Sequence, residues 1–265
     1  MIGLKLFAGF VMFMQWSSYP TSNVPRKADG SPNLQAPTPR TPEGKPDFSG
    51  TWAPENNRPC PPEGCADMEV PQEFLNIAWG LRKDLPFQSW AAAVKKKRME
   101  DNNKDDPVSR CLPGGIVKLH TTPLLKKFIQ IPGLLVTLNE MDATYRQIFM
   151  DGRSLPSDFD LPSAKGFSVA KWDGDALVVT TKGFPDGLWL DRQGTPMSDA
   201  AVITERFTRP NYGNMYIEVT VDDPKVFTAP WTVKLHHQIQ LDMELIDYLC
   251  VDNEKDVIPG HMVGK

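Results

Sequence analysis

The sequence predicts a mainly β protein, in which an antiparallel meander closes into a barrel or forms a strongly curled sheet and carries a small helical insertion. Three observations predict this fold. After residue 124, short segments that alternate polar and apolar residues follow one another, with turn-forming residues between them. The chain of 265 residues contains 25 prolines and 19 glycines, and so much proline disfavours a helical bundle. About nine strands are expected in all, which is enough to close a barrel.

An export signal or N-terminal anchor is predicted over residues 1–20. Lys5 precedes a run without polar residues, Leu6–Met14, and a positive charge before such a run is typical of a signal peptide. The run is shorter than the ~20 apolar residues that cross a bilayer. No later run is long enough either, so no membrane span is expected in the mature chain. We therefore expect a periplasmic or extracellular protein.

A proline-rich linker is predicted over residues 21–46, where Pro, Ser, Thr and Asn predominate. No apolar face recurs along it. One β-rich domain is predicted over residues 47–265, and its first strand is expected at Phe48–Trp52.

The helical insertion is expected at about residues 71–101. Apolar residues at helical spacing predict one helix over Pro71–Lys83. A second helix begins near Trp90 and ends in the basic run Lys95–Arg98. Positive charge suits the C-terminal end of a helix dipole, so this run is interpreted as a solvated helix end rather than a binding patch.

Eight further strands are predicted towards the C-terminus. Turn residues separate them, most clearly at Pro132-Gly133, Asp151-Gly152 and Asp173-Gly174. Because no long helix lies between these strands, neighbours in sequence are expected to pair antiparallel. The predicted strands are Phe128–Ile131, Leu134–Glu140, Thr144–Met150, Phe167–Trp172, Ala176–Lys182, Val202–Thr208, Met215–Val221 and Thr232–Leu241.

Four cysteines in an exported chain indicate two disulfides. Cys60 and Cys65 bracket a Pro-Pro-Glu-Gly turn that could bring them together, and Cys111 would then pair with Cys250. The alternative is a zinc site, which usually uses pairs of cysteines separated by two residues. Such pairs are absent from the sequence, and no metal is expected.

The first predicted strand resembles a motif of the calycins, the lipocalins and fatty-acid-binding proteins. The motif here is Asp47-Phe48-Ser49-Gly50-Thr51-Trp52. In calycins a Gly-x-Trp strand places the Trp across the closed end of an up-and-down barrel. The segment Lys171–Leu177 resembles a hairpin late in the same meander. The resemblance implies a calycin-like barrel, at the level of the fold.

A wider resemblance covers the chain from Asp47 to the C-terminus. The matching motifs are Leu85–Ala91, Asp106–Pro113, Tyr145–Arg153, Trp172–Val179, Thr204–Phe207, Val221–Pro224 and Pro230–Thr232. Together they are similar to a large family of exported bacterial proteins, mostly uncharacterised. The resemblance implies export and favours the Cys111–Cys250 pair, since it covers both cysteines.

This sequence departs from the family at positions that commonly hold histidine. The residues found there are Thr195, Met197, Val202 and Asn214. A metal role is therefore not expected for this chain, and no cofactor is expected.

Alternation along the strands identifies candidate inward side chains. His237 lies on the apolar face of its strand, and the adjacent His236 lies on the other face. Glu205 and Arg146 also lie on apolar faces. Glu205 and His237 are the candidate catalytic acid/base pair, on strands about 10 Å apart; alternatively, His237 is a core residue with one hydrogen bond. Arg146 would form a buried ion pair with Glu205 or clamp a ligand carboxylate.

Other residues are candidates for contacts with a ligand. Tyr145, Trp172 and Trp231 offer flat apolar surface to a ring-bearing molecule, or they are ordinary core residues. Asp151 and Arg153 form either a plain hairpin turn or the mouth of a pocket.

Composition and missing motifs narrow the function. The formal charge of −4 disfavours a nucleic-acid partner. Phosphate loops, dinucleotide fingerprints and Gly-x-Ser-x-Gly elbows are absent. We expect a barrel that binds a small, partly apolar or aromatic molecule. The alternatives are an isomerase, cyclase or hydrolase that uses Glu205 and His237, and an envelope protein with a protein partner. The oligomeric state is left open.

Overall fold

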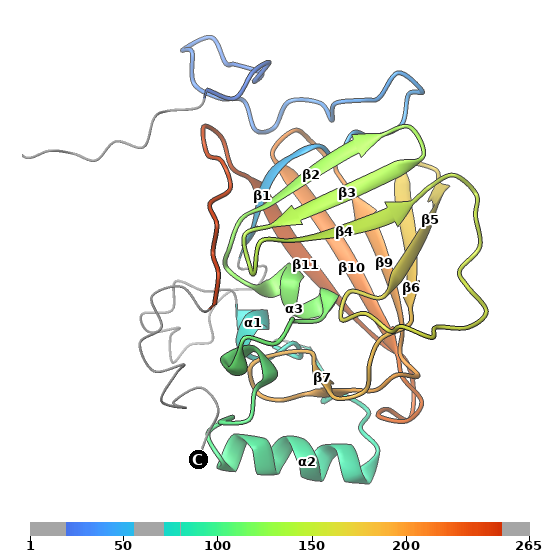
Figure 1. Cartoon of the computed structure of the whole chain (residues 1–265). Helices are drawn as coiled ribbons and strands as arrows, with labels where there is room; N and C mark the ends of the chain where they lie inside the picture. The colour runs from blue at the N-terminus through green and yellow to red at the C-terminus, as the bar shows by residue number, and fades with distance from the viewer. Residues whose placement is uncertain (1–19, 56–71, 80, 251–265) are drawn as a thin grey trace, which may run out of the picture.

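The computed structural model describes residues 20–55, 72–79 and 81–250. Nine strands form a closed barrel in the order β1-β11-β10-β9-β6-β5-β4-β3-β2 (Figure 1). They are β1 Gly50–Glu55, β2 Lys126–Ile131, β3 Leu134–Asn139, β4 Thr144–Phe149, β5 Phe167–Asp173, β6 Ala176–Lys182, β9 Val202–Thr208, β10 Asn214–Asp222 and β11 Trp231–Ile239. The short strands β7 Leu188–Trp189 and β8 Pro196–Met197 pair separately. The predicted mainly β barrel is confirmed.

One pair of barrel strands departs from the predicted antiparallel pattern. β4 and β5 are parallel, and their register contains only Ile148 opposite Ser168 and Phe149 opposite Val169. A loop of residues 150–166 carries the chain back to the start of β5, so the expected hairpin at Asp151-Gly152 does not form. Because so few residues pair, the pairing of β4 with β5 is the least extensive in the barrel.

Among the described residues, two helices are present that the sequence does not predict, and the first predicted helix is shorter than expected. They are α1 Gln72–Leu75, α2 Ser89–Glu100, the 3-10 helix η1 Pro107–Arg110 and α3 Ile116–Thr121. α2 is confirmed, but the helix predicted over Pro71–Lys83 is wrong beyond Leu75. There the Ile77 amide donates to the Asp191 carboxylate at 3.0 Å, and the Asn76 side chain accepts from the Ala78 amide at 3.1 Å. These bonds replace helical ones.

α3 enters one end of the barrel. All six of its residues are buried, and in Figure 1 it lies below β2, β3 and β4. A six-residue helix is too short to show a helical period, which explains why the sequence analysis missed it. α3 and inward side chains such as Leu135, Ile148 and Leu177 form the core of this end.

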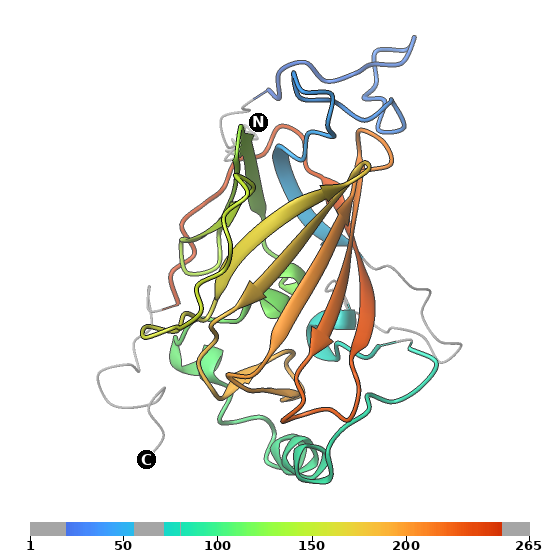
Figure 2. The ribbon, with the colours of Figure 1, turned by 90° about the vertical axis from the view of Figure 1, so that its right-hand side faces the viewer.

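Trp52 packs inside the barrel on β1 and is fully buried. Its indole Nε1 donates to the Phe48 carbonyl at 3.0 Å, and the Arg209 guanidinium lies 4.8 Å from its ring centroid. Figure 2 shows the proline-rich N-terminal segment crossing one end of the barrel, with α2 beyond the other end. The amides of Tyr212 and Gly213 donate to carbonyls of this segment at 2.8 Å, so it packs against the barrel.

Cys111 and Cys250 form a disulfide, as predicted. The bond ties the end of η1 to the chain that follows β11. Cys60, Cys65 and the predicted signal segment up to residue 19 lie outside the described residues. In the part of the chain that the structure describes, no helix has the length and apolar character needed to cross a membrane.

Candidate functional site

Glu205 is the centre of a polar network inside the barrel. Its side chain points inward from β9, as predicted, and is fully buried. Arg146 Nη1 donates to Oε1 at 2.9 Å, and Arg146 Nη2 donates to Oε2. His120 Nε2 lies 2.6 Å from Oε1. The carboxylate is therefore held by a two-pronged arginine contact and by an imidazole.

Arg146 reaches this carboxylate from β4. Its Nε donates to the Ser168 hydroxyl at 3.0 Å and its Nη2 donates to the Thr181 hydroxyl at 2.9 Å. With the two bonds to Glu205, four of the five guanidinium N–H bonds have partners. The ion pair that the sequence analysis considered is present, and three strands contribute to its hydrogen bonds.

The network keeps Glu205 ionised. Burial would raise the pKa of this carboxyl, but the charge of Arg146 and the hydrogen bonds from Arg146 and His120 lower it to about 2. A buried ion pair of this kind tolerates the loss of neither partner, because the remaining charge would be stranded in a dry interior.

His120, which the sequence analysis did not select, contributes the third member of the network. It comes from α3, and its ring makes an edge contact with Phe207 at 5.9 Å between centroids. An ionised carboxylate only accepts hydrogen bonds, so a neutral His120 carries its proton on Nε2, facing Glu205. Burial lowers the pKa of His120 and favours this neutral form. Its Nδ1 is buried without a hydrogen-bond partner.

His237 is fully buried, as the alternation predicts, but it does not contact Glu205. Its Nε2 donates to the His120 carbonyl at 3.0 Å, and its Nδ1 is buried without a partner. Burial, with the charge of Lys126, holds the pKa of His237 well below its ordinary value. His120 therefore lies between Glu205 and His237, the two residues predicted as an acid/base pair. His236 is half-buried and bonds Asn214 at 2.8 Å.

Lys126 is a buried cation that the sequence analysis also missed. It points inward from β2, two residues before the buried Phe128, and its Nζ lies 3.4 Å from the His120 carbonyl. Burial lowers its pKa to about 7, although the charge of Glu140 opposes the shift. Extending the predicted strand by two residues would have placed Lys126 on the inward face.

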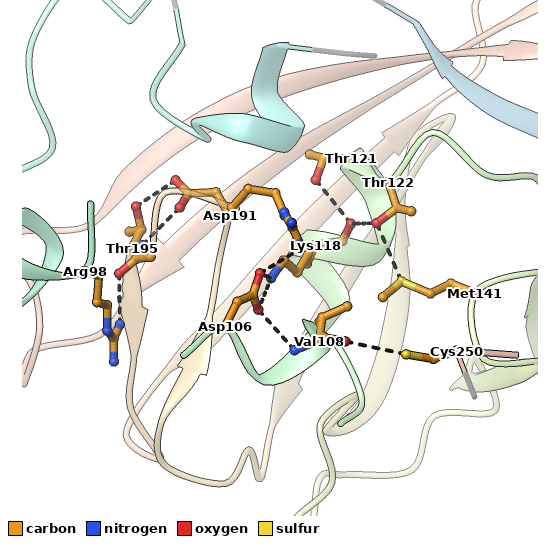
Figure 3. Close-up of polar contacts among 12 residues, drawn as sticks. Arg98, Asp106, Val108, Lys118, Thr121, Thr122, Met141, Asp191, Thr195 and Cys250 are labelled. Atoms are coloured by element: carbon orange, nitrogen blue, oxygen red, sulfur yellow. Dashed lines mark hydrogen bonds and ion pairs between the residues drawn. The ribbon is translucent and has the colours of Figure 1, made fainter. Parts of the chain in front are cut away.

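A second buried ion pair fixes α3 from below (Figure 3). Lys118 Nζ lies 2.8 Å and 2.9 Å from the two carboxylate oxygens of Asp106, and Arg192 donates to the same carboxylate at 3.1 Å. Beside this pair, the Thr195 hydroxyl donates to Asp191 at 2.7 Å. α3 is thus anchored on both sides, and His120 is held in place against Glu205.

A pocket of about 460 Å³ opens in the barrel wall where β4 and β5 separate. We call it the seam pocket. One wall consists of residues 143–147 with Phe149, and the other of Ser163 with residues 165–168. Arg146 and Ser168 belong to both this lining and the buried network. The seam pocket therefore reaches the network from outside.

Of the predicted ligand residues, Tyr145 and Arg146 line this pocket, and Asp151 and Arg153 do not. Tyr145 lines it with 65% of its surface exposed. Asp151 and Arg153 form an ion pair at 2.6 Å. The Arg153 guanidinium also lies 3.8 Å from the ring centroid of Phe149, which lines the pocket. The turn thus contacts one lining residue, Phe149, without lining the pocket itself.

Trp172 and Trp231 lie elsewhere. Trp172 stacks on Phe48 with 6.1 Å between centroids and lines a separate pocket of about 340 Å³ beside the N-terminal segment. Trp231 is buried and makes an edge contact with Phe227 at 5.4 Å. The predicted ligand residues therefore do not form a single site.

These features define the class of protein: a closed β-barrel in which the helix α3 fills one end and an arginine, a glutamate and a histidine form a buried network. Within the described ranges, no three His, Cys, Asp or Glu side chains lie together as a metal site requires. No protein-family model matches the chain, and no curated protein or solved structure matches it.

Proposed function

We propose that this protein is an exported barrel that binds a small, partly apolar or aromatic molecule at the seam pocket. The main support is the position of Arg146. It is only 5% exposed, yet it lines a pocket that opens to solvent and joins the Glu205 network. A ligand in the pocket would thus lie beside a residue whose side chain the network already fixes, and a preformed wall lowers the entropic cost of binding.

The barrel interior is a less favourable place for the ligand. α3 occupies one end, and His120 fills the space between Glu205 and His237. The seam pocket instead lies where the wall has its fewest paired residues, so a ligand can enter there without displacing α3.

Export is part of the proposal and is supported by the Cys111–Cys250 disulfide. Disulfides persist in the periplasm and outside cells, and they are rare where thiols are kept reduced. The formal charge of −4 agrees with a small-molecule partner rather than nucleic acid.

The test is a screen of aromatic fragments by ligand-observed NMR, after native mass spectrometry of the purified chain for molecules already bound. Tyr145→Ala should weaken binding of the hits several-fold, because an exposed aromatic wall is lost. Tyr216→Ala is the matched control, since Tyr216 lies on β10, stacks on His236 of β11 and does not line the pocket. Absence of any hit, or equal effects of both variants, would refute the seam pocket as the binding site.

A second candidate function is catalysis, and one observation favours it. His120 is oriented by an ionised carboxylate and keeps a bare Nδ1, which is the arrangement of a general base. On this scaffold Glu205 would position His120 rather than act with His237. His120→Gln should then abolish turnover of a bound molecule but leave its affinity within a few-fold. Retained turnover would exclude His120 as the base.

A further inference from the structure

We infer that the seam pocket selects an organic anion, a planar aromatic or conjugated carboxylate, whose charged group binds the ammonium of Lys165. This inference rests on the proposed function and names the class of ligand. It is carried by the charges, the aromatic walls and the turn that surround the pocket.

The two charged residues that line the pocket, Arg146 and Lys165, are both basic. Glu205 neutralises Arg146 at contact distance. Lys165 forms no ion pair within 4 Å among the residues that the structure describes. Asp142 is the acidic group that acts on Lys165, but it is not in the lining, and its carboxylate accepts a hydrogen bond from the Cys250 amide.

Lys165 is therefore a partly desolvated cation at a pocket wall. Burial lowers its pKa, which means that the charged form has lost hydration. A bound carboxylate would restore the lost interaction, and the charge-assisted hydrogen bond would be stronger than one between neutral groups. A neutral ligand would not replace the hydration that the ammonium group has lost.

Aromatic side chains form the apolar part of the pocket. Tyr145, Phe149 and Phe167 all line it. Phe149 is covered by Arg153 at 3.8 Å, and Phe167 packs on Phe159 with 5.4 Å between centroids. Because neighbours hold two of the three rings, the pocket presents preformed flat walls, which suit a planar ring or conjugated chain.

A tight turn holds Lys165 on the wall that faces Tyr145 and Phe149. The Gly166 amide donates to the Ser163 carbonyl at 2.8 Å, and the Ser163 amide donates to the Gly183 carbonyl at 2.9 Å. Gly166 has a φ of +58°, and a Cβ there would lie 2.6 Å from the Thr181 side chain. Only glycine fits this position, so the turn and its lysine are fixed against β6.

The experiment compares cinnamate with cinnamamide, which has the same planar frame and no charge, by isothermal titration calorimetry. Lys165→Met removes the charge and keeps much of the side-chain length, and Lys165→Arg restores a cation. Lys171→Met is the matched control, because Lys171 is an exposed lysine on β5 that does not line the pocket. Circular dichroism establishes that each variant is folded.

We expect cinnamate to bind the native chain about tenfold more tightly than cinnamamide does. Lys165→Met should remove this preference, Lys165→Arg should keep most of it, and Lys171→Met should leave it unchanged. If both probes bind alike and Lys165→Met changes neither, the anion inference is overturned while the seam pocket stands. If neither probe binds and the fragment screen is also empty, the proposed function fails with it.

Discussion

Glu205→Gln tests the buried network at its centre. The substitution removes the negative charge and keeps the size of the side chain, so Arg146 retains a charge inside the barrel without a counter-ion. The pKa of Glu205 is about 2 rather than 4.5. At about 1.36 kcal/mol for each pKa unit, this difference corresponds to roughly 3 kcal/mol of stability at neutral pH. Breaking a buried ion pair generally costs a similar amount, about 3–5 kcal/mol.

The effect should depend on pH in a defined direction. The folded chain holds the Glu205 pKa below its unfolded value, so the stabilisation is complete above about pH 4.5 and is lost as the pH falls through about 2. At pH 3 the difference between native chain and variant should be about half of that at pH 7.

Urea unfolding followed by tryptophan fluorescence measures this difference at both pH values. Glu218→Gln is the control, since Glu218 is a half-exposed glutamate on β10 and lies 3.9 Å from Lys234. The control should change the unfolding free energy by less than about 0.5 kcal/mol. A loss below about 1 kcal/mol for Glu205→Gln at pH 7, or an equal loss at pH 3, would refute the reasoning.

Three further predictions concern the disulfide, the turn at the seam and the buried lysine. Reducing Cys111–Cys250, which closes a separation of 139 residues, should lower the unfolding free energy by about 4–5 kcal/mol in urea titrations, and a loss below about 1 kcal/mol would contradict this. Gly166→Ala should lower the unfolding free energy by roughly 2–3 kcal/mol, because the added Cβ meets Thr181. Gly152→Ala is the comparison, with φ +86° and open space around the added Cβ, and should lower it by about 1 kcal/mol. Equal losses for the two variants in thermal unfolding would be inconsistent with the fixed turn. The pKa of Lys126 is about 7 when folded and 10.5 otherwise, so the unfolded chain binds more protons in this range and stability rises with pH. Lys126→Met should therefore be more stable than the native chain at pH 6, and this advantage should shrink by pH 10; a constant difference between the two pH values would count against it.

The inward side chains could be predicted because alternation along a strand is a local property. Glu205, Arg146 and His237 each lie on an apolar face, and the structure buries all three. The ion pair between Glu205 and Arg146 was one of the two alternatives for Arg146, and it is present because a buried carboxylate requires a partner. The catalytic and ligand-binding roles of these residues remain predictions.

Other members of the site could not be predicted. His120 lies on a helix of six residues whose position inside the barrel depends on Asp106, 12 residues from Lys118, and on Glu205, 85 residues from His120. The seam pocket depends on where the loop of residues 150–166 returns the chain. Neither the placement of α3 nor the path of this loop produces a periodic pattern in the sequence. Lys126 was missed because the predicted strand began two residues late.

The sequence by itself determined the nine barrel strands, though not β7 and β8, and the buried face of the strands that carry Arg146, Glu205 and His237. These properties follow from alternation over a few neighbouring residues and from turn residues, and both are local. Only the tertiary structure decided that β4 and β5 run parallel, that α3 enters the barrel and that Lys165 faces the seam pocket. Such arrangements depend on packing between segments far apart in the chain, and many loop paths are compatible with the same local pattern.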